Sequence, residues 1–377
     1  MKKIYILGIF LLLLLTGCGQ NQTANETLQI NEEVPPNVTN IPLSDADRNY
    51  YSSQRQETGQ KDGEKLVRWI NVTWENEIRY LYEYQDGNKL RFELASLQPD
   101  NTWEISTPEW EQALLKKAKA PLDSLEICSD GSYLAMIQPE DDLPVFYHIL
   151  LDGTVTEHHL PDGILEWKKD SHEMANGMLL TEKDEIALST YTIPLGEKQD
   201  IESDGTNHQE PAHLIVYNPY TKKLVSKRNY IGLAQDLFIK GDHVFSIYGN
   251  SIHVYLLKGG DIQSTYTTDE LQKKSANQSV CTYPGGNYAY WYTNLGIYRL
   301  DVSLVANAEN TVEKLIPSKY YQPPEKNFSI ITMSCIEDGK TASIYIKGST
   351  YEEEEVDDEN KIFHFSDPVL TKYVYEE

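Results

Sequence analysis

An acidic segment near the end of the chain contains the densest set of side chains that could bind a metal ion. Carboxylate oxygens are the ligands that Ca²⁺ prefers. The candidate calcium ligands are Glu352, Glu354, Asp357 and Asp358. The segment lacks the alternate-residue spacing and the turn glycine of a recognised calcium loop. It equally fits a solvated loop between two strands, so both interpretations stay open.

The histidines form no recognised metal motif. His158 and His159 are adjacent, and neighbouring residues on a strand point to opposite faces, so this pair is poorly placed to chelate one metal. The dipeptide His172-Glu173 is followed by Asn176 at the position where the HExxH zinc motif needs its second histidine. No catalytic metal and no cofactor are predicted.

No nucleophile motif points to a hydrolase. The GxSxG elbow of serine hydrolases does not occur in the sequence. Ser129-Asp130-Gly131 and Ser203-Asp204-Gly205 resemble the repeated turns of sialidases, but they lack the spacing and the tryptophan. We therefore predict no catalytic residue. Carboxylates that are distant in sequence could still meet in one glycosidase-type site, and a single sequence does not show such pairs.

Four cysteines are present, and the first differs from the others in its surroundings. The other three are Cys128, Cys281 and Cys335, which are far apart in the sequence and form no CxxC pair. Each of them lies in an apolar strand pattern. A free cysteine in such a pattern behaves as a small apolar residue. We expect these three residues in the core, and neither zinc ligation nor a redox dithiol.

Cys18 follows a targeting sequence. Lys2 and Lys3 precede the apolar run Ile4–Leu15, and Leu15-Thr16-Gly17-Cys18 resembles the bacterial lipobox. The resemblance implies that residues 1–17 are a signal peptide, that cleavage precedes Cys18, and that acyl chains such as palmitate hold the protein at the extracytoplasmic face of the cell membrane. The alternative is a transmembrane anchor, but about 12 apolar residues are fewer than the roughly 20 that span a bilayer. Either envelope type, Gram-positive or Gram-negative, is compatible.

Charge excludes one class of partner. The chain has 33 basic and 58 acidic residues. Loss of Lys2 and Lys3 with the signal peptide leaves 31 and 58, a net charge of −27. Such a surface repels nucleic acid, so we predict no nucleic-acid binding.

Residues 18–63 have the composition of a linker. They are rich in Gln, Asn, Thr, Glu and Pro and show no apolar periodicity, so they bury too little surface to offset the entropy of ordering. We expect a lipidated cysteine followed by a flexible, disordered tether with a reach of about 35–40 Å.

Residues 64–377 have the pattern of an all-β domain. Alternating apolar residues flank the turns Asp86-Gly87 and Asp152-Gly153, which is typical of hairpins. A unit of strand, turn and Tyr- or Ile-rich strand recurs six times, and its turns lie at Asn76, Gly131, Asp184, Gly241, Gly285 and Gly339. The gaps of 55, 53, 57, 44 and 54 residues suit four-stranded blades. We predict a six-bladed β-propeller; a β-sandwich, a pair of barrels or a seven- or eight-bladed ring is the alternative.

Two short helices are expected as connectors between blades. Thr107 and Pro108 have the types of an N-cap and a first-turn residue before an apolar helical face. Thr267 and Glu270 resemble a capping box that opens the segment 271–274.

One blade also carries a family resemblance. Tyr290-Trp291-Tyr292-Thr293-Asn294 resembles the YWTD propeller repeat, with an inserted Tyr and with Asn in place of Asp. The resemblance implies a six-bladed architecture and no particular ligand. More generally, the chain resembles uncharacterised propeller lipoproteins of Gram-positive bacteria.

We predict a lipid-anchored, non-enzymatic binding or assembly module of the cell envelope. Propellers gather loops over one central funnel, which suits a protein, peptide or glycan partner. The candidate aromatic anchors are Trp74, Trp103, Trp167 and Trp291. The alternative is a carbohydrate-active hydrolase or lyase with carboxylates at the propeller mouth.

Overall fold

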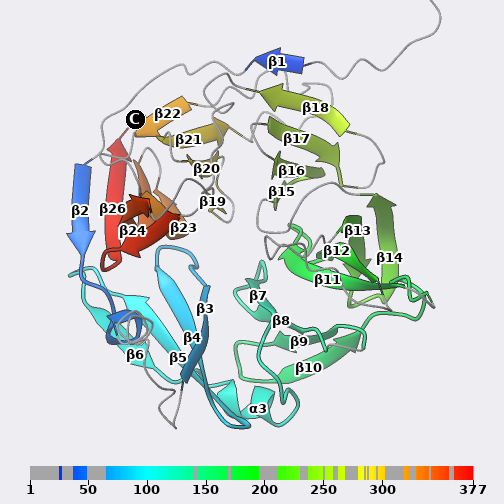
Figure 1. Cartoon of the computed structure of the whole chain (residues 1–377). Coiled ribbons are helices and arrows are strands. Elements are labelled where there is room, and N and C mark those ends of the chain that lie inside the picture. Colours follow the sequence, from blue (N-terminus) through cyan, green and yellow to red (C-terminus); the bar gives the residue numbers. More distant parts are fainter. Residues whose placement is uncertain are drawn as a thin grey trace, which may run out of the picture.

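The structure is a computed structural model. It describes residues 25–27, 37–48, 65–139, 142–168, 171–194, 210–229, 237–248, 251–257, 262–267, 279–283, 286, 288–293, 296–301, 318–321, 328–338, 341–355 and 361–376. These residues form a β-propeller in which six sheets are arranged around a central axis (Figure 1). We call each sheet a blade and number the blades in chain order. The prediction of an all-β propeller is confirmed.

The first three blades have four strands each, in chain order. Blade one contains β3 (Lys65–Asn71), β4 (Arg79–Asp86), β5 (Lys89–Leu97) and β6 (Trp103–Ser106). Blade two contains β7 (Ser124–Ile127), β8 (Tyr133–Ile137), β9 (Val145–Ile149) and β10 (Val155–His159). Blade three contains β11 (Ser171–Leu180), β12 (Ile186–Pro194), β13 (Glu210–Asn218) and β14 (Lys223–Asn229).

The last three blades include two strands from the N-terminal segment. Blade four contains β15 (Leu237–Lys240), β16 (His243–Tyr248), β17 (Ser251–Leu256), β18 (Ile262–Thr267) and β1 (Asn25–Thr27). Blade five contains β19 (Ser279–Thr282), β20 (Tyr288–Thr293), β21 (Gly296–Asp301) and β22 (Ser318–Tyr321). Blade six contains β23 (Phe328–Asp338), β24 (Thr341–Glu355), β26 (Val369–Glu376) and β2 (Asn37–Ile41), and β25 (Lys361–Phe365) pairs with the end of β24.

The sequence repeat corresponds to the first two strands of each blade. The innermost strands are β3, β7, β11, β15, β19 and β23, and each is followed by its antiparallel partner (Figure 1). Gly131 has a φ of +84° and Asp184 a φ of +55°, so these two turn residues of the repeat adopt the left-handed conformation that tight turns require. Gly285 and Gly339 lie outside the described residues.

Apolar side chains fill the spaces between neighbouring blades. One such cluster contains Phe146 of blade two and Tyr217 of blade three, and both residues are fully buried. Cys128 lies just after β7, and Cys281 and Cys335 lie on β19 and β23; all three are buried and free. Their predicted place in the core is confirmed.

The prediction that residues 18–63 form a featureless tether is wrong for residues 25–27 and 37–48. β1 pairs in parallel with β18, and β2 pairs antiparallel with β26. β2 therefore closes the ring by joining the N-terminal segment to the last strand of the chain. Backbone hydrogen bonds need no apolar periodicity at a sheet edge, so a polar strand such as β2 escapes a search for alternating residues.

The helical predictions are met in part. A helix, α3 (Glu111–Leu115), connects blades one and two, as expected. It begins after Trp110 rather than after Thr107, and no side chain caps it. Instead, the Glu111 carboxylate accepts a hydrogen bond from the Phe92 backbone N–H at 2.8 Å. The second expected helix, at 271–274, lies outside the described residues. Among the described helices none is long and apolar enough to cross a membrane.

Candidate functional site

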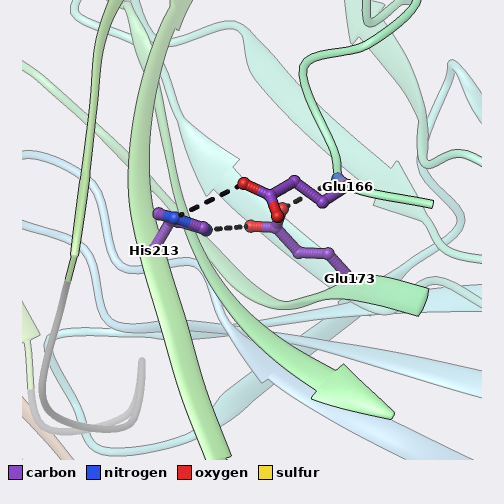
Figure 2. Close-up of side chains that lie close together, drawn as sticks. All are labelled: Glu166, Glu173 and His213. Atoms are coloured by element: carbon purple, nitrogen blue, oxygen red, sulfur yellow. Dashed lines mark hydrogen bonds and ion pairs between the residues drawn. The ribbon is translucent and has the colours of Figure 1, made fainter. Parts of the chain in front are cut away.

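Two glutamates and a histidine converge on the third blade (Figure 2). Glu166 lies in the connector from blade two, Glu173 on β11 and His213 on β13. Lys227 of β14 reaches the same place. We call these four residues the charged cluster. It lies at the end of blade three that the connector from blade two enters, near the starts of β11 and β13.

A short hairpin positions the two glutamates. The backbone N–H of Glu173 donates to the Glu166 carbonyl at 2.9 Å, and that of Lys168 donates to the Ser171 carbonyl at 2.8 Å. Residues 166–168 thus pair with residues 171–173, which are the first residues of β11. Paired residues share a face of the hairpin, so Glu166 and Glu173 point to the same side.

Hydrogen bonds and ion pairs connect all members of the cluster. His213 Nδ1 lies 2.8 Å from Glu173 Oε1, and its Nε2 lies 3.9 Å from Glu166 Oε1. The Lys227 ammonium lies 3.0 Å from Glu173 Oε2 and 3.4 Å from Glu166 Oε1. It also donates to the Ile164 carbonyl at 2.9 Å. Lys227 is therefore a cation held between two carboxylates.

Glu173 is the buried centre of the cluster. Its side chain is 2% exposed, against 19% for His213 and 44% for Glu166. Burial by itself would raise the pKa of Glu173, but hydrogen bonds from the Thr190 hydroxyl, the Glu166 N–H, Lys227 and His213 outweigh it and leave the pKa below its ordinary value. Glu173 is thus held as a carboxylate.

Glu166 is exposed and differently supported. Its pKa is lowered, first by a hydrogen bond from Lys168 and then by the charge of Lys227. The Lys168 ammonium lies 3.0 Å from Glu166 Oε2. Because solvent screens exposed pairs of this kind, their contribution to stability is small.

The donor set of the cluster is one that binds divalent metals. One ligand atom from each of Glu166, Glu173 and His213 lies within 4.8 Å of the others. Imidazole and carboxylate together suit zinc, manganese or iron. Lys227, however, already supplies positive charge to both carboxylates, so a metal ion could bind only where the ammonium moved away. The arrangement is that of an internally neutralised charge network.

The opposite side of the hairpin carries an aromatic pair. The rings of Trp167 and His172 stack with centroids 4.1 Å apart and planes 20° apart. Trp167 is 39% exposed. A rigid, partly exposed indole at the connector end of the ring is a surface on which a ligand can pack.

The other predicted aromatic anchors have different places. The Trp103 indole N–H donates to the Pro42 carbonyl at 2.8 Å, and its ring packs on Tyr80. The Trp74 ring covers Gly131, at 3.3 Å from the position that a Cβ would take. Both are structural contacts. The side chain of Trp291 lies outside the described residues.

The acidic segment near the C-terminus is brought together only in part. Glu352 and Glu354 lie on β24, whereas Asp357 and Asp358 lie outside the described residues. Glu352 is exposed. No sequence motif predicts the charged cluster. His172-Glu173 lacks the second histidine of a zinc motif, and His213 and Lys227 are 40 and 54 residues from Glu173.

No protein-family model and no curated protein matches the chain. Among solved structures, the chain is similar to a protein of unknown function from Bacteroides thetaiotaomicron, with a TM-score of 0.41 and 11% identity over 90% of this chain and 76% of the other. It is also similar to BamB from Moraxella catarrhalis, with a TM-score of 0.33 and 9% identity over 82% and 97%. It is similar, too, to Hsv2 from Kluyveromyces lactis, with a TM-score of 0.33 and 10% identity over 81% of this chain and 99% of the other. At this level the similarity does not extend to activity.

Proposed function

We propose that this protein is a lipid-anchored, six-bladed β-propeller that acts as a non-enzymatic binding or assembly module on the extracytoplasmic side of the cell membrane. The observation that carries the proposal is the state of the charged cluster. Its buried carboxylate is occupied by donors of the protein itself, while an aromatic pair on the same hairpin faces outward. The site is therefore suited to present a surface and poorly suited to transfer a proton.

The geometry of Glu173 argues against a role in proton transfer. A general acid or base must reach the substrate within hydrogen-bond distance and titrate near the working pH. Glu173 is 2% exposed, and its pKa lies below the ordinary value of a glutamate. It thus lacks both properties, and its contacts instead fix the hairpin that carries Trp167.

The lipid anchor rests on the sequence. Cys18 directly follows Leu15-Thr16-Gly17 and a short apolar run, which is the pattern that resembles a lipobox. Metabolic labelling with a palmitate analogue tests this part. We expect label in the wild-type protein and none in Cys18→Ala; equal labelling of both would refute the anchor.

The binding role is tested by crosslinking in cells, followed by purification of the tagged lipoprotein from its own membrane and mass spectrometry. We expect one abundant envelope partner with the wild-type protein and a strong loss of that partner with Trp167→Ala. Leu151→Ala is the matched control, because Leu151 is 69% exposed and lies in the β9–β10 turn at the other end of the ring. Recovery of the wild-type protein alone would contradict the binding role.

A carbohydrate-active hydrolase or lyase is the second candidate, because the structure does bring two carboxylates together. Glu166 is the one that solvent reaches, at 44% exposure. If the protein cleaves glycans, Glu166→Gln should abolish cleavage of cell-wall polysaccharide, and Trp167→Ala should weaken binding of the same polymer. Absence of any cleavage by the wild-type protein would remove this candidate.

A further inference from the structure

The N-terminal segment meets the propeller much earlier than its composition predicts. β1 lies only a few residues after Cys18 and pairs with β18, with Asn25 opposite Thr265 and Thr27 opposite Thr267. β18 is the outer strand of blade four, so β1 adds a further strand to the outer edge of that blade (Figure 1). The first described residues after Cys18 therefore lie on the perimeter of the ring.

The chain length between the lipid and this point sets an upper limit on the distance to the membrane. Seven Cα–Cα steps separate Cys18 from Asn25. A fully extended chain spans at most about 3.3–3.6 Å per residue, which gives roughly 25 Å. This limit is shorter than the reach of about 35–40 Å expected for an unstructured linker of 45 residues.

We infer that the lipid anchor holds the propeller with the outer edge of blade four toward the bilayer, so that blade one, on the opposite side of the ring, is the part farthest from it. The inference rests on the proposed lipidation of Cys18. The surface that faces this edge is that of the lipid bilayer.

The charge of the edge strands is compatible with a lipid surface. The strands along this arc of the ring are β1, β18, β22 and β2. Their only charged residues are Glu26 and Lys319, so together they have no net charge. The chain as a whole has a formal charge of −25. Anionic lipid headgroups repel an acidic surface, so an edge without net charge approaches them at a lower electrostatic cost than an acidic edge would.

This orientation leaves both ends of the ring accessible. The charged cluster and Trp167 lie at the connector end of blade three, not on the outer edge of blade four. A partner in the envelope could then reach Trp167 from the side, without passing between the ring and the bilayer.

Energy transfer from single dyes to labelled lipid headgroups tests the orientation. The full-length lipoprotein is purified from its own membrane and reconstituted into phosphatidylcholine vesicles that contain an acceptor-labelled lipid. One variant carries a dye on Leu224→Cys of β14, next to blade four, and the other on Ile105→Cys of β6 in blade one. The two native side chains are matched in exposure, at 46% and 44%. The three native thiols of the folded domain are buried and should not compete for the dye.

We expect transfer from position 224 to be at least twofold more efficient than from position 105. A 20-residue Gly/Ser insertion after Gly19 should reduce this difference, because it lengthens the connection to the lipid. Equal transfer, or stronger transfer from position 105, in vesicles that carry the protein would overturn the orientation alone. Vesicle flotation is measured first: protein that fails to float with the vesicles would overturn the lipid anchor, and the orientation with it.

Discussion

The Lys347 ammonium lies 2.8 Å from Asp47 Oδ1, and the side chains of both residues are buried, with exposures of 0% and 1%. Lys347 belongs to β24 of blade six, whereas Asp47 belongs to the N-terminal segment that follows β2. The ammonium also lies 4.1 Å from the centre of the Trp69 ring of blade one. One ion pair thus joins the N-terminal segment to the junction between the last blade and the first.

Loss of this pair should destabilise the domain strongly. Asp47→Asn removes the charge that compensates a buried ammonium, and breaking a buried pair in this way costs about 3–5 kcal/mol. We expect urea unfolding midpoints to fall accordingly, and part of the loss to be recovered in the double variant with Lys347→Met. The control is Asp45→Asn, whose carboxylate is 82% exposed and pairs with Arg48. A midpoint for Asp47→Asn equal to that of the control would contradict the assignment.

Removal of the N-terminal segment should have a similar effect. A protein that begins at residue 65 lacks β2 and Asp47, whereas one that begins at residue 37 keeps both. We expect the shorter protein to unfold at clearly lower urea concentration and to expose β26 as an unpaired edge, which favours association. Size-exclusion chromatography and urea titration of the two proteins check this. Equal stability would show that the segment is dispensable for folding.

The parts of the fold that were predictable depend on local signals. Asp86-Gly87 and Gly131 are turn residues next to alternating apolar strands, and such patterns act over a few residues. The contribution of β2 was not predictable, because Asn37–Ile41 is a mostly polar edge strand whose partner lies more than 300 residues away. The charged cluster was not predictable for the same reason. Its geometry depends on how four strands and a connector are placed relative to one another, and the spacing of residues in the sequence does not show this placement.

Neutralisation of the charged cluster by Lys227 can be measured. Lys227→Met leaves the buried Glu173 carboxylate with less compensation, so we expect a loss of about 2–3 kcal/mol at pH 7. The loss should shrink in the double variant with Glu173→Gln and also at acidic pH, where the carboxylate is protonated. Lys168→Met is the control, because this lysine is 64% exposed and pairs with the exposed Glu166. Equal effects of the two lysine variants would argue against a buried network.

The three cysteines of the folded domain should be unreactive. Burial raises the pKa of the Cys128 thiol to about 11. Burial also raises the pKa of Cys335, which interacts with Cys281. Because the thiolate is the reactive form, a disulfide reagent at pH 8 should modify no thiol of the folded, unlipidated Cys18→Ser protein and three thiols after unfolding in urea. Rapid modification of the folded protein would show that one of these positions opens to solvent.

Glu83 should make stability depend on pH. Its side chain is buried, it accepts a hydrogen bond from the Leu122 N–H at 3.1 Å, and burial raises its pKa from 4.5 to about 7. Since the folded-state pKa is the higher one, the stability associated with the neutral carboxyl is fully present below pH 4.5 and is lost as the pH rises through 7. The shift corresponds to about 3 kcal/mol at pH 8.

Glu83→Gln isolates this effect, because a glutamine keeps an acceptor for the Leu122 N–H and does not titrate. We expect the variant and the wild-type protein to differ little in free energy of unfolding at pH 5, and the variant to be the more stable of the two at pH 8. Urea titrations across this range measure the difference. Glu109→Gln is the control, since Glu109 is exposed. A difference between Glu83→Gln and wild type that stays constant from pH 5 to pH 8 would mean that Glu83 does not titrate in this window.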